Sequence, residues 1–160
     1  MRRHGPGPSR AADAGAKVPL LDVNVLIALA WPNHVHHPAA TAWFAAIPNR
    51  KFATAPVTEA GFVRVSSNAR LTPQARTPQA AHVALCAITA LPGHVFWVDD
   101  KTLAASVHIA WDRIGSAARV TDAHLLAIAL GHRACLATFD RALVNLIPAG
   151  APRDAVLLLS

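Results

Sequence analysis

Four acidic residues of this chain occupy positions that favour metal chemistry. Asp22 directly follows an apolar run that begins at Val18, and Asp140 follows another apolar segment. Glu59 and Asp122 lie in the first turns of two segments with helical patterns. A buried carboxylate without a partner costs roughly 3–5 kcal/mol, so Asp22 in particular needs one. A hard divalent cation such as Mg²⁺, which carboxylates and waters hold in proteins, would be a suitable partner.

The elements that must position these acids alternate between strands and helices. Strands are predicted at residues 18–22, 51–55, 94–100 and 155–160, and a strand followed by a turn is predicted at residues 134–140. Helices are predicted at residues 23–31, 37–47, 56–67, 77–91, 103–111, 120–132 and 141–147. The alternation predicts an α/β domain of three layers, α/β/α, with a mostly parallel central sheet. In such a sheet the carboxyl ends of the strands meet the starts of the following helices at one edge, where ligands bind. The four acids are therefore predicted to share a negative pocket.

Two of the predicted helices carry signals at their ends. Thr77 is a suitable N-cap for the helix 77–91, and Pro78 suits the position after it. Thr121 is a suitable cap for the start of the helix 120–132, and Gly131 lies near its end. These signals mark where the two helices are expected to begin and where the second is expected to end.

Each acid also has an ordinary role open to it. Asp122 could complement a helix dipole, which is worth about 0.3–1 kcal/mol. Asp22 and Asp140 could cap the helices that follow them, and Glu59 could be a solvated helix residue. Four acids at corresponding ends of strands and helices are harder to explain in this way, so the metal pocket remains the favoured interpretation.

Length and composition indicate one folded domain after a tail. The chain has 160 residues, 53% of them hydrophobic, which is enough for a substantial core of ordinary domain size. Residues 1–17 are rich in Gly, Pro, Ala and Arg and contain no apolar stretch of the kind found in secretory signals. We expect residues 1–17 to form a disordered tail and residues 18–160 to form the domain.

The charge balance favours a polyanionic partner. Lys and Arg number 15 against 9 Asp and Glu, and the sequence pI is near 10.7. A basic surface of this kind favours nucleic acid first, although many basic proteins carry such charge only for solubility. Several arginines are candidates for phosphate contacts: Arg64, Arg70, Arg76, Arg113 and Arg119.

Membrane insertion and a disulfide framework are both disfavoured. The uncharged stretches 23–49 and 80–98 are interrupted by Pro-containing turns, and neither supplies the roughly 20 consecutive apolar residues that a spanning helix needs. Cys86 and Cys135 each lie in an apolar run and lack CxxC spacing. We expect both to be buried, reduced thiols of a cytoplasmic protein.

Four motifs resemble those of the PIN-domain family, especially its VapC-type toxins of bacterial toxin–antitoxin pairs. They are LLDVNVLIA, TAPVTEAGFVRVSSN, VTDAHLLAIAL and LATFD, and together they extend over residues 20–140. Each motif alone is weak, but their order is specific. The resemblance implies a Mg²⁺- or Mn²⁺-dependent endoribonuclease that inhibits translation. It also implies a cognate antitoxin, an RNA substrate and a homodimer.

Matched onto this sequence, the resemblance gives each acid a role. Asp22, Asp122 and Asp140 would be metal ligands, directly or through water, and Glu59 would be a ligand or would orient the attacking water. The catalytic and metal-binding quartet is thus expected to be these four acids. Supporting polar positions flank them: Asn24, Thr121 and Thr138.

Two other functional classes remain as alternatives. The first is a catalytically inert PIN-like module that binds RNA or protein without cutting it. The second is a phospho-acceptor domain of receiver type, suggested by the sequence DDK at Asp99–Lys101. A receiver needs an acidic pair after its first strand, where this chain offers only Asp22.

Overall fold

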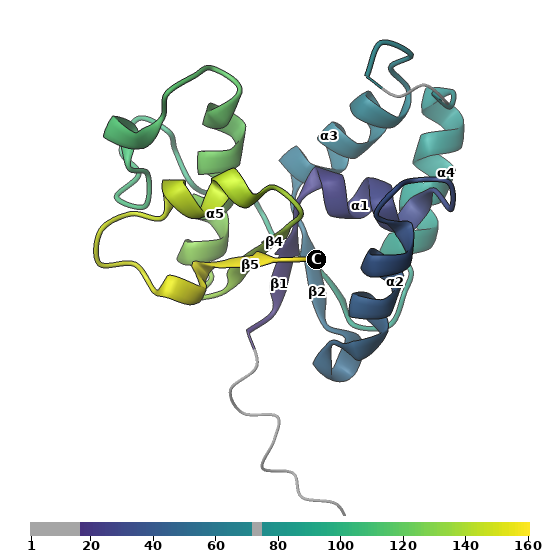
Figure 1. The fold of residues 1–160 in the computed structure, drawn as a ribbon, viewed down its shortest axis with the longest axis horizontal. Helices are drawn as coiled ribbons and strands as arrows, with labels where there is room; N and C mark the ends of the chain where they lie inside the picture. The colour runs from purple at the N-terminus through teal and green to yellow at the C-terminus, as the bar shows by residue number, and fades with distance from the viewer. Residues whose placement is uncertain (1–16, 72–74) are drawn as a thin grey trace, which may run out of the picture.

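A five-stranded sheet forms the centre of the protein (Figure 1). The computed structural model describes residues 17–71 and 75–160. All strand pairs are parallel, and the strand order is β3-β2-β1-β4-β5. The strands are β1 (Pro19–Leu21), β2 (Phe52–Thr54), β3 (His94–Phe96), β4 (Cys135–Thr138) and β5 (Val156–Leu158). The tail expected for residues 1–17 lies outside the described residues except for Lys17.

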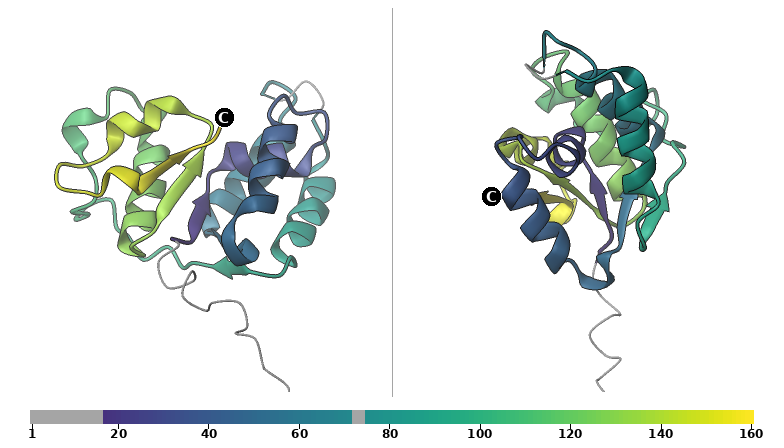
Figure 2. Two further views of the ribbon diagram at one scale, coloured as in Figure 1. Left: turned by 60° about the horizontal axis from the view of Figure 1, so that its bottom comes forward. Right: turned by 90° about the vertical axis from the view of Figure 1, so that its right-hand side faces the viewer.

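Helices cover both faces of this sheet. Five are α-helical: α1 (Val23–Ala30), α2 (His37–Ala46), α3 (Pro56–Ser66), α4 (Pro78–Thr89) and α5 (Arg119–Gly131). Four short 3₁₀ segments complete the described part: η2 (Pro48–Arg50), η3 (Trp111–Arg113), η4 (Arg141–Leu146) and η5 (Arg153–Ala155). Figures 1 and 2 show α5 on one side of the sheet and α1, α2 and α4 on the other. The predicted three-layer α/β/α architecture is confirmed.

Successive side chains of β1, the central strand, point to opposite faces of the sheet and so pack in two different core clusters. Leu20 packs in one cluster with Leu126 and other residues of α5, whereas Leu21 packs in a second cluster with Phe62 of α3 and with α1. Both leucines are fully buried. A parallel sheet covered on both faces requires such continuous apolar strands, which is why β1 has no polar side chain before Asp22.

The sheet grows in opposite directions from β1: β2 and β3 are added on one side of it, and β4 and β5 on the other. β1 and β4 are paired in parallel, with Leu20 opposite Leu136. In open α/β sheets the crevice at the carboxyl ends of two such strands is the usual ligand-binding place.

The helix predicted for residues 103–111 is wrong. This segment forms turns, and only η3 at its end is helical. The hydroxyl oxygens of Thr102 and Ser106 accept hydrogen bonds from the backbone N–H groups of Ala104 and His108, at 3.2 and 3.3 Å. Such local bonds compete with the helical ladder, and Val107, which a helix would have to bury, is 85% exposed.

The predicted helix ends have mixed outcomes. Thr77 is the N-cap of α4, because its hydroxyl accepts from the backbone N–H of Ala80 at 3.1 Å. Thr121 does not cap α5, which begins two residues earlier at Arg119 and has Ala118 at its N-cap. Arg119, in the first turn of this helix, forms ion pairs that are described below.

The two cysteines differ from each other, so the expectation that both are buried is wrong for one of them. Cys135 is buried in β4, and burial raises the pKa of its thiol to about 11. Cys86 lies on the solvent-facing side of α4 and is exposed. Neither forms a disulfide. Among the described helices, none is long and apolar enough to cross a membrane.

Candidate active site

Asp22 is held at the carboxyl end of β1 by hydrogen bonds to both carboxylate oxygens. Its Oδ1 accepts from the backbone N–H of Val23 at 2.6 Å, so Asp22 caps α1 as its ordinary role suggested. Its Oδ2 accepts from the hydroxyl of Thr138 at 2.6 Å. The residue is only 6% exposed. One position therefore combines capping with a nearly buried charge.

A polar network around Thr138 joins the ends of β1 and β4. The Thr138 hydroxyl accepts from Asn24 Nδ2 at 3.0 Å and from the backbone N–H of Asp140 at 3.0 Å. Asn24 Oδ1 in turn accepts from the backbone N–H of Phe139 at 3.3 Å. Thr138 is fully buried, so its position and its hydrogen bonds are fixed by the surrounding core. The network thereby fixes the backbone next to Asp22 and Asp140 at the crevice between β1 and β4.

Asp122 and Asp140 are bridged by one arginine nitrogen. Arg119 Nη1 donates to Asp122 Oδ2 at 3.0 Å and to Asp140 Oδ2 at 2.5 Å. The second oxygen of Asp140 accepts from the backbone N–H of Ala142 at 2.9 Å. Helix α5 leads into β4 and runs in the opposite direction to it, so the first turn of α5 lies at the carboxyl edge of the sheet. The three aspartates thus gather where β1, β4 and α5 meet.

The charges of the three aspartates act on one another. Burial, followed by repulsion from Asp122 and Asp140, raises the pKa of Asp22 to about 6 despite its hydrogen bonds. Burial also raises the pKa of Asp122, against the attraction of Arg119. Burial acts in the same direction on Asp140, but its hydrogen bonds to Arg119 and Ala142 outweigh it and lower the pKa. Negative charge at Asp22 is therefore incompletely compensated.

The carboxylates of Asp22, Asp122 and Asp140 suit a hard divalent cation in their chemistry, but they do not form a complete coordination site. The oxygen atoms available at Asp22, Asp122 and Asp140 are the ligands that Mg²⁺ prefers. Uncompensated charge at a nearly buried carboxylate is also what a cation would relieve. Within the described residues, however, no group of three or more acidic, His or Cys side chains converges on one point. Arg119 supplies the positive charge between two of the acids instead.

Glu59 has different partners from the three aspartates. It lies in the first turn of α3, and its Oε1 accepts from the buried hydroxyl of Thr54 at 2.6 Å. The Thr54 hydroxyl also lies 2.7 Å from Nε2 of His94. No described hydrogen bond or ion pair joins Glu59 to Asp22, Asp122 or Asp140. A common pocket for all four acids therefore remains a prediction.

Sequence reasoning missed some residues around these acids and included one without a partner. Thr54 begins one of the four motifs and His94 begins a predicted strand, but neither was singled out as a site residue, although Thr54 contacts Glu59 and His94 contacts Thr54. Arg119 was a candidate for phosphate contact and not for pairing with acids. Thr121 is exposed, and no described hydrogen bond involves its side chain. Arg119 precedes Asp122 by three residues on one helix, and this spacing is a recognisable signal of an ion pair that could have revealed the contact.

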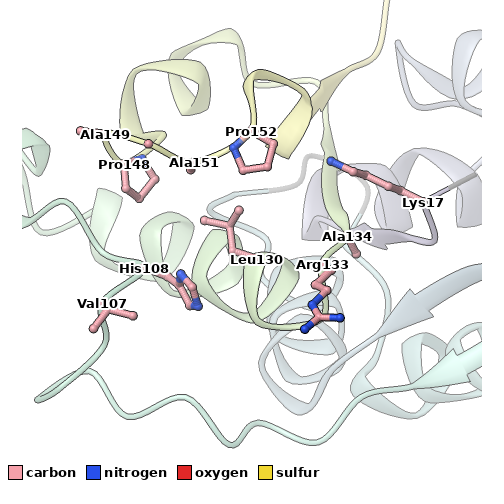
Figure 3. Close-up of a pocket in the computed structure, with 11 residues that line it drawn as sticks. Lys17, Val107, His108, Leu130, Arg133, Ala134, Pro148, Ala149, Ala151 and Pro152 are labelled. Carbon is pink, nitrogen blue, oxygen red and sulfur yellow. The ribbon is translucent and has the colours of Figure 1, made fainter. Parts of the chain in front are cut away.

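A separate cavity of about 520 Å³ lies away from the acids. Figure 3 shows it between the end of α5 and the loop that precedes β5, with Leu130, Pro148 and Pro152 on its walls. Lys17 and Arg133 reach it from positions just before β1 and β4. These positions are at the amino ends of the strands, opposite the aspartates. The cavity is therefore distinct from the candidate site.

Comparison with known proteins decides the family. The family model described as PIN domain matches residues 20–146. The chain belongs to the PIN-domain family. The resemblance expected from the sequence motifs is thereby confirmed, and the matched region contains the four acids and the three flanking polar residues.

Relatives of this PIN domain are VapC proteins of Mycobacterium tuberculosis. It is 49% identical to Ribonuclease VapC39 over 131 residues, which cover 82% of this chain and 94% of the relative. It is 43% identical to Ribonuclease VapC38 over 141 residues, or 88% of this chain and 97% of the relative. The PIN domain is therefore of the VapC type.

A solved structure supports the fold independently. The crystal structure of Mycobacterium tuberculosis VapC20, described as a Sarcin-Ricin loop cleaving toxin, matches this PIN domain with a TM-score of 0.54. The match covers 83% of this chain and 98% of the VapC20 chain. Sequence identity is 15%, so the likeness concerns the fold alone.

Proposed function

We propose that this PIN domain is a metal-dependent endoribonuclease and the toxin of a toxin–antitoxin pair. The observation that supports the proposal most is the group of three aspartates at the crevice between β1 and β4, where Asp22 keeps an uncompensated charge. The relatives named as VapC ribonucleases support the reaction class. The net charge of +6 suits a polyanionic substrate such as RNA.

Some residues of the site would bind a cation, and others would position the residues that bind it. Asp22, Asp122 and Asp140 would hold Mg²⁺, or Mn²⁺, directly or through water. When bound, such an ion orients the scissile phosphate, activates water and stabilises charge on the leaving oxygen. Thr138 and Asn24 hold the ends of β1 and β4, next to Asp22 and Asp140, in place through the hydrogen bonds described above. Thr121 is the exposed flanking position and has no assigned contact.

Glu59 would act from the neighbouring strand end. Its bond to Thr54 fixes one carboxylate oxygen and leaves the other to serve as a ligand or to orient water. Burial lowers the pKa of His94, the second neighbour of Thr54, although the charge of Glu59 acts in the opposite direction. The lowered pKa of His94 favours the neutral imidazole beside Thr54.

The biological partners follow from the same proposal. The protein would cut RNA in the cytoplasm and thereby inhibit translation. A cognate antitoxin would bind the protein and suppress cleavage, and the toxin would form a homodimer.

The test is incubation of the purified protein with total RNA in Mg²⁺ or in EDTA. We expect discrete cleavage products in Mg²⁺, none in EDTA, and suppression when the product of the neighbouring gene is added. Absence of cleavage under all conditions, together with retained RNA or protein binding, would instead assign the chain to the inert binding modules.

A further inference from the structure

Arg119 is a positive group in direct contact with two of the candidate metal ligands. It is the first residue of α5, and its side chain is 32% exposed. A single nitrogen, Nη1, contacts one oxygen of Asp122 and one oxygen of Asp140. The side chain therefore bridges two acids that come from different elements of the fold.

One atom bridging two carboxylates occupies the position that a divalent cation would take between them. The oxygens of Asp122 and Asp140 that face Arg119 are its acceptors and cannot at the same time be direct ligands of an ion at that position. Two positive groups in one place also repel. Binding of Mg²⁺ between these acids would therefore require the guanidinium to leave.

A displaced guanidinium would remain beside the site because α5 anchors its backbone. Guanidinium presents paired N–H donors in a planar fork that matches phosphate oxygens. The start of a helix also favours a phosphate group through the helix dipole. A scissile phosphate placed at the aspartates would thus lie near both groups.

We propose that Arg119 is a phosphate-binding residue of this site, held on Asp122 and Asp140 until a metal ion displaces it. The inference rests on the proposed function, because it takes these aspartates as metal ligands. Without metal, Arg119 neutralises the acids and the phosphate-binding group is occupied. With metal, the same guanidinium is free to bind the RNA backbone, so metal and phosphate bind with positive coupling.

The first arm of the test measures Mg²⁺ affinity without any nucleic acid. Thermal melting is followed against Mg²⁺ concentration for the wild type and for Arg119→Gln. Arg153→Gln is the matched control, because Arg153 is exposed in η5 at the opposite end of the sheet and its loss changes the net charge equally. We expect Arg119→Gln to bind Mg²⁺ about tenfold more tightly, within the usual range of such couplings. Arg153→Gln should match the wild type.

The outcomes of this arm separate the two proposals. Equal or weaker Mg²⁺ binding by Arg119→Gln would overturn the displacement of Arg119 while leaving a metal site in place. Absence of any Mg²⁺ shift in all three proteins would overturn the metal-dependent function itself. Arg119→Lys guards against a folding defect: it keeps the positive charge and should tighten Mg²⁺ binding less than Arg119→Gln does.

The second arm measures phosphate binding with inorganic phosphate as the probe. The wild type should gain melting temperature from phosphate in Mg²⁺ but not in EDTA. Arg119→Gln should lose that gain, and Arg119→Lys should lose most of it because it lacks the planar fork. An equal phosphate gain in the wild type and Arg119→Gln, or no gain in either, would overturn the phosphate-binding role.

Discussion

Asp22→Asn should stabilise the metal-free protein at alkaline pH. Burial and the neighbouring acids raise the pKa of Asp22 from an ordinary value of 3.8 to about 6. The folded state therefore favours the protonated carboxyl. Its stabilising contribution is complete below pH 3.8 and is lost as pH rises through 6. At pH 8 the wild type carries the full cost of the buried charge, and the variant does not.

The magnitude follows from this shift and from the hydrogen bonds of Asp22. A pKa difference of about 2 units corresponds to about 3 kcal/mol. Asparagine offers one acceptor oxygen to the two donors, Val23 N–H and Thr138 hydroxyl, and this mismatch costs about 1 kcal/mol. The net gain at pH 8 is therefore about 2 kcal/mol, or about 4–8 °C in melting temperature for a chain of this size.

The assay is thermal melting in EDTA at several pH values between 4.5 and 8. The advantage of Asp22→Asn should grow with pH and level off above pH 7. Asp154→Asn is the matched control, because the hydrogen bond from Lys17 lowers the pKa of the exposed Asp154 and gives its charge the opposite sign of effect. A variant that is no more stable than the wild type at pH 8, or an advantage that does not depend on pH, would refute the reasoning.

Three further predictions concern other described residues. Asp140→Asn should lower the free energy of unfolding at pH 7 by less than about 1 kcal/mol, because hydrogen bonds outweigh burial and lower the pKa of that partly exposed carboxyl. The loss should shrink as pH falls, and a loss that urea titrations find independent of pH would contradict this prediction. Thr54→Val should cost about 1–3 kcal/mol by removing the donor to Glu59, as denaturant unfolding would measure, and an unchanged unfolding midpoint would contradict the contact. A thiol reagent at pH 8 should label Cys86 in the native protein and reach Cys135 only after denaturation; equal rates would contradict their different burial.

The fold was predictable from sequence where apolar pattern and turn signals agree. Strand β1, with leucines facing both layers, and helix α4, with Thr77 at its cap, follow the expectations closely. The segment 103–111 did not, because its apolar spacing resembles a helix while Thr102 and Ser106 form local bonds that favour turns. The strand order was also beyond local pattern, since it depends on contacts between segments far apart in the chain.

The candidate site shows a similar division. The positions of Asp22, Asp122 and Asp140 at strand and helix ends were predictable because parallel strands present their carboxyl ends at one edge. The charges between them were not: Arg119 bonds to Asp140 across 21 positions, which no local spacing reveals. The contact of Glu59 with Thr54 depends on a buried hydroxyl that sequence pattern alone does not distinguish.

The measurement that tests the central claim most directly is RNA cleavage in Mg²⁺ by the wild type and by Asp22→Asn at equal soluble concentration. Asp22 accepts hydrogen bonds from Val23 and Thr138 and carries the charge that the proposed cation compensates. We expect the wild type to cut RNA and the variant to be inactive while it retains a cooperative melting transition. Cleavage by Asp22→Asn at the wild-type rate would contradict the assignment of these aspartates as the metal site of a ribonuclease.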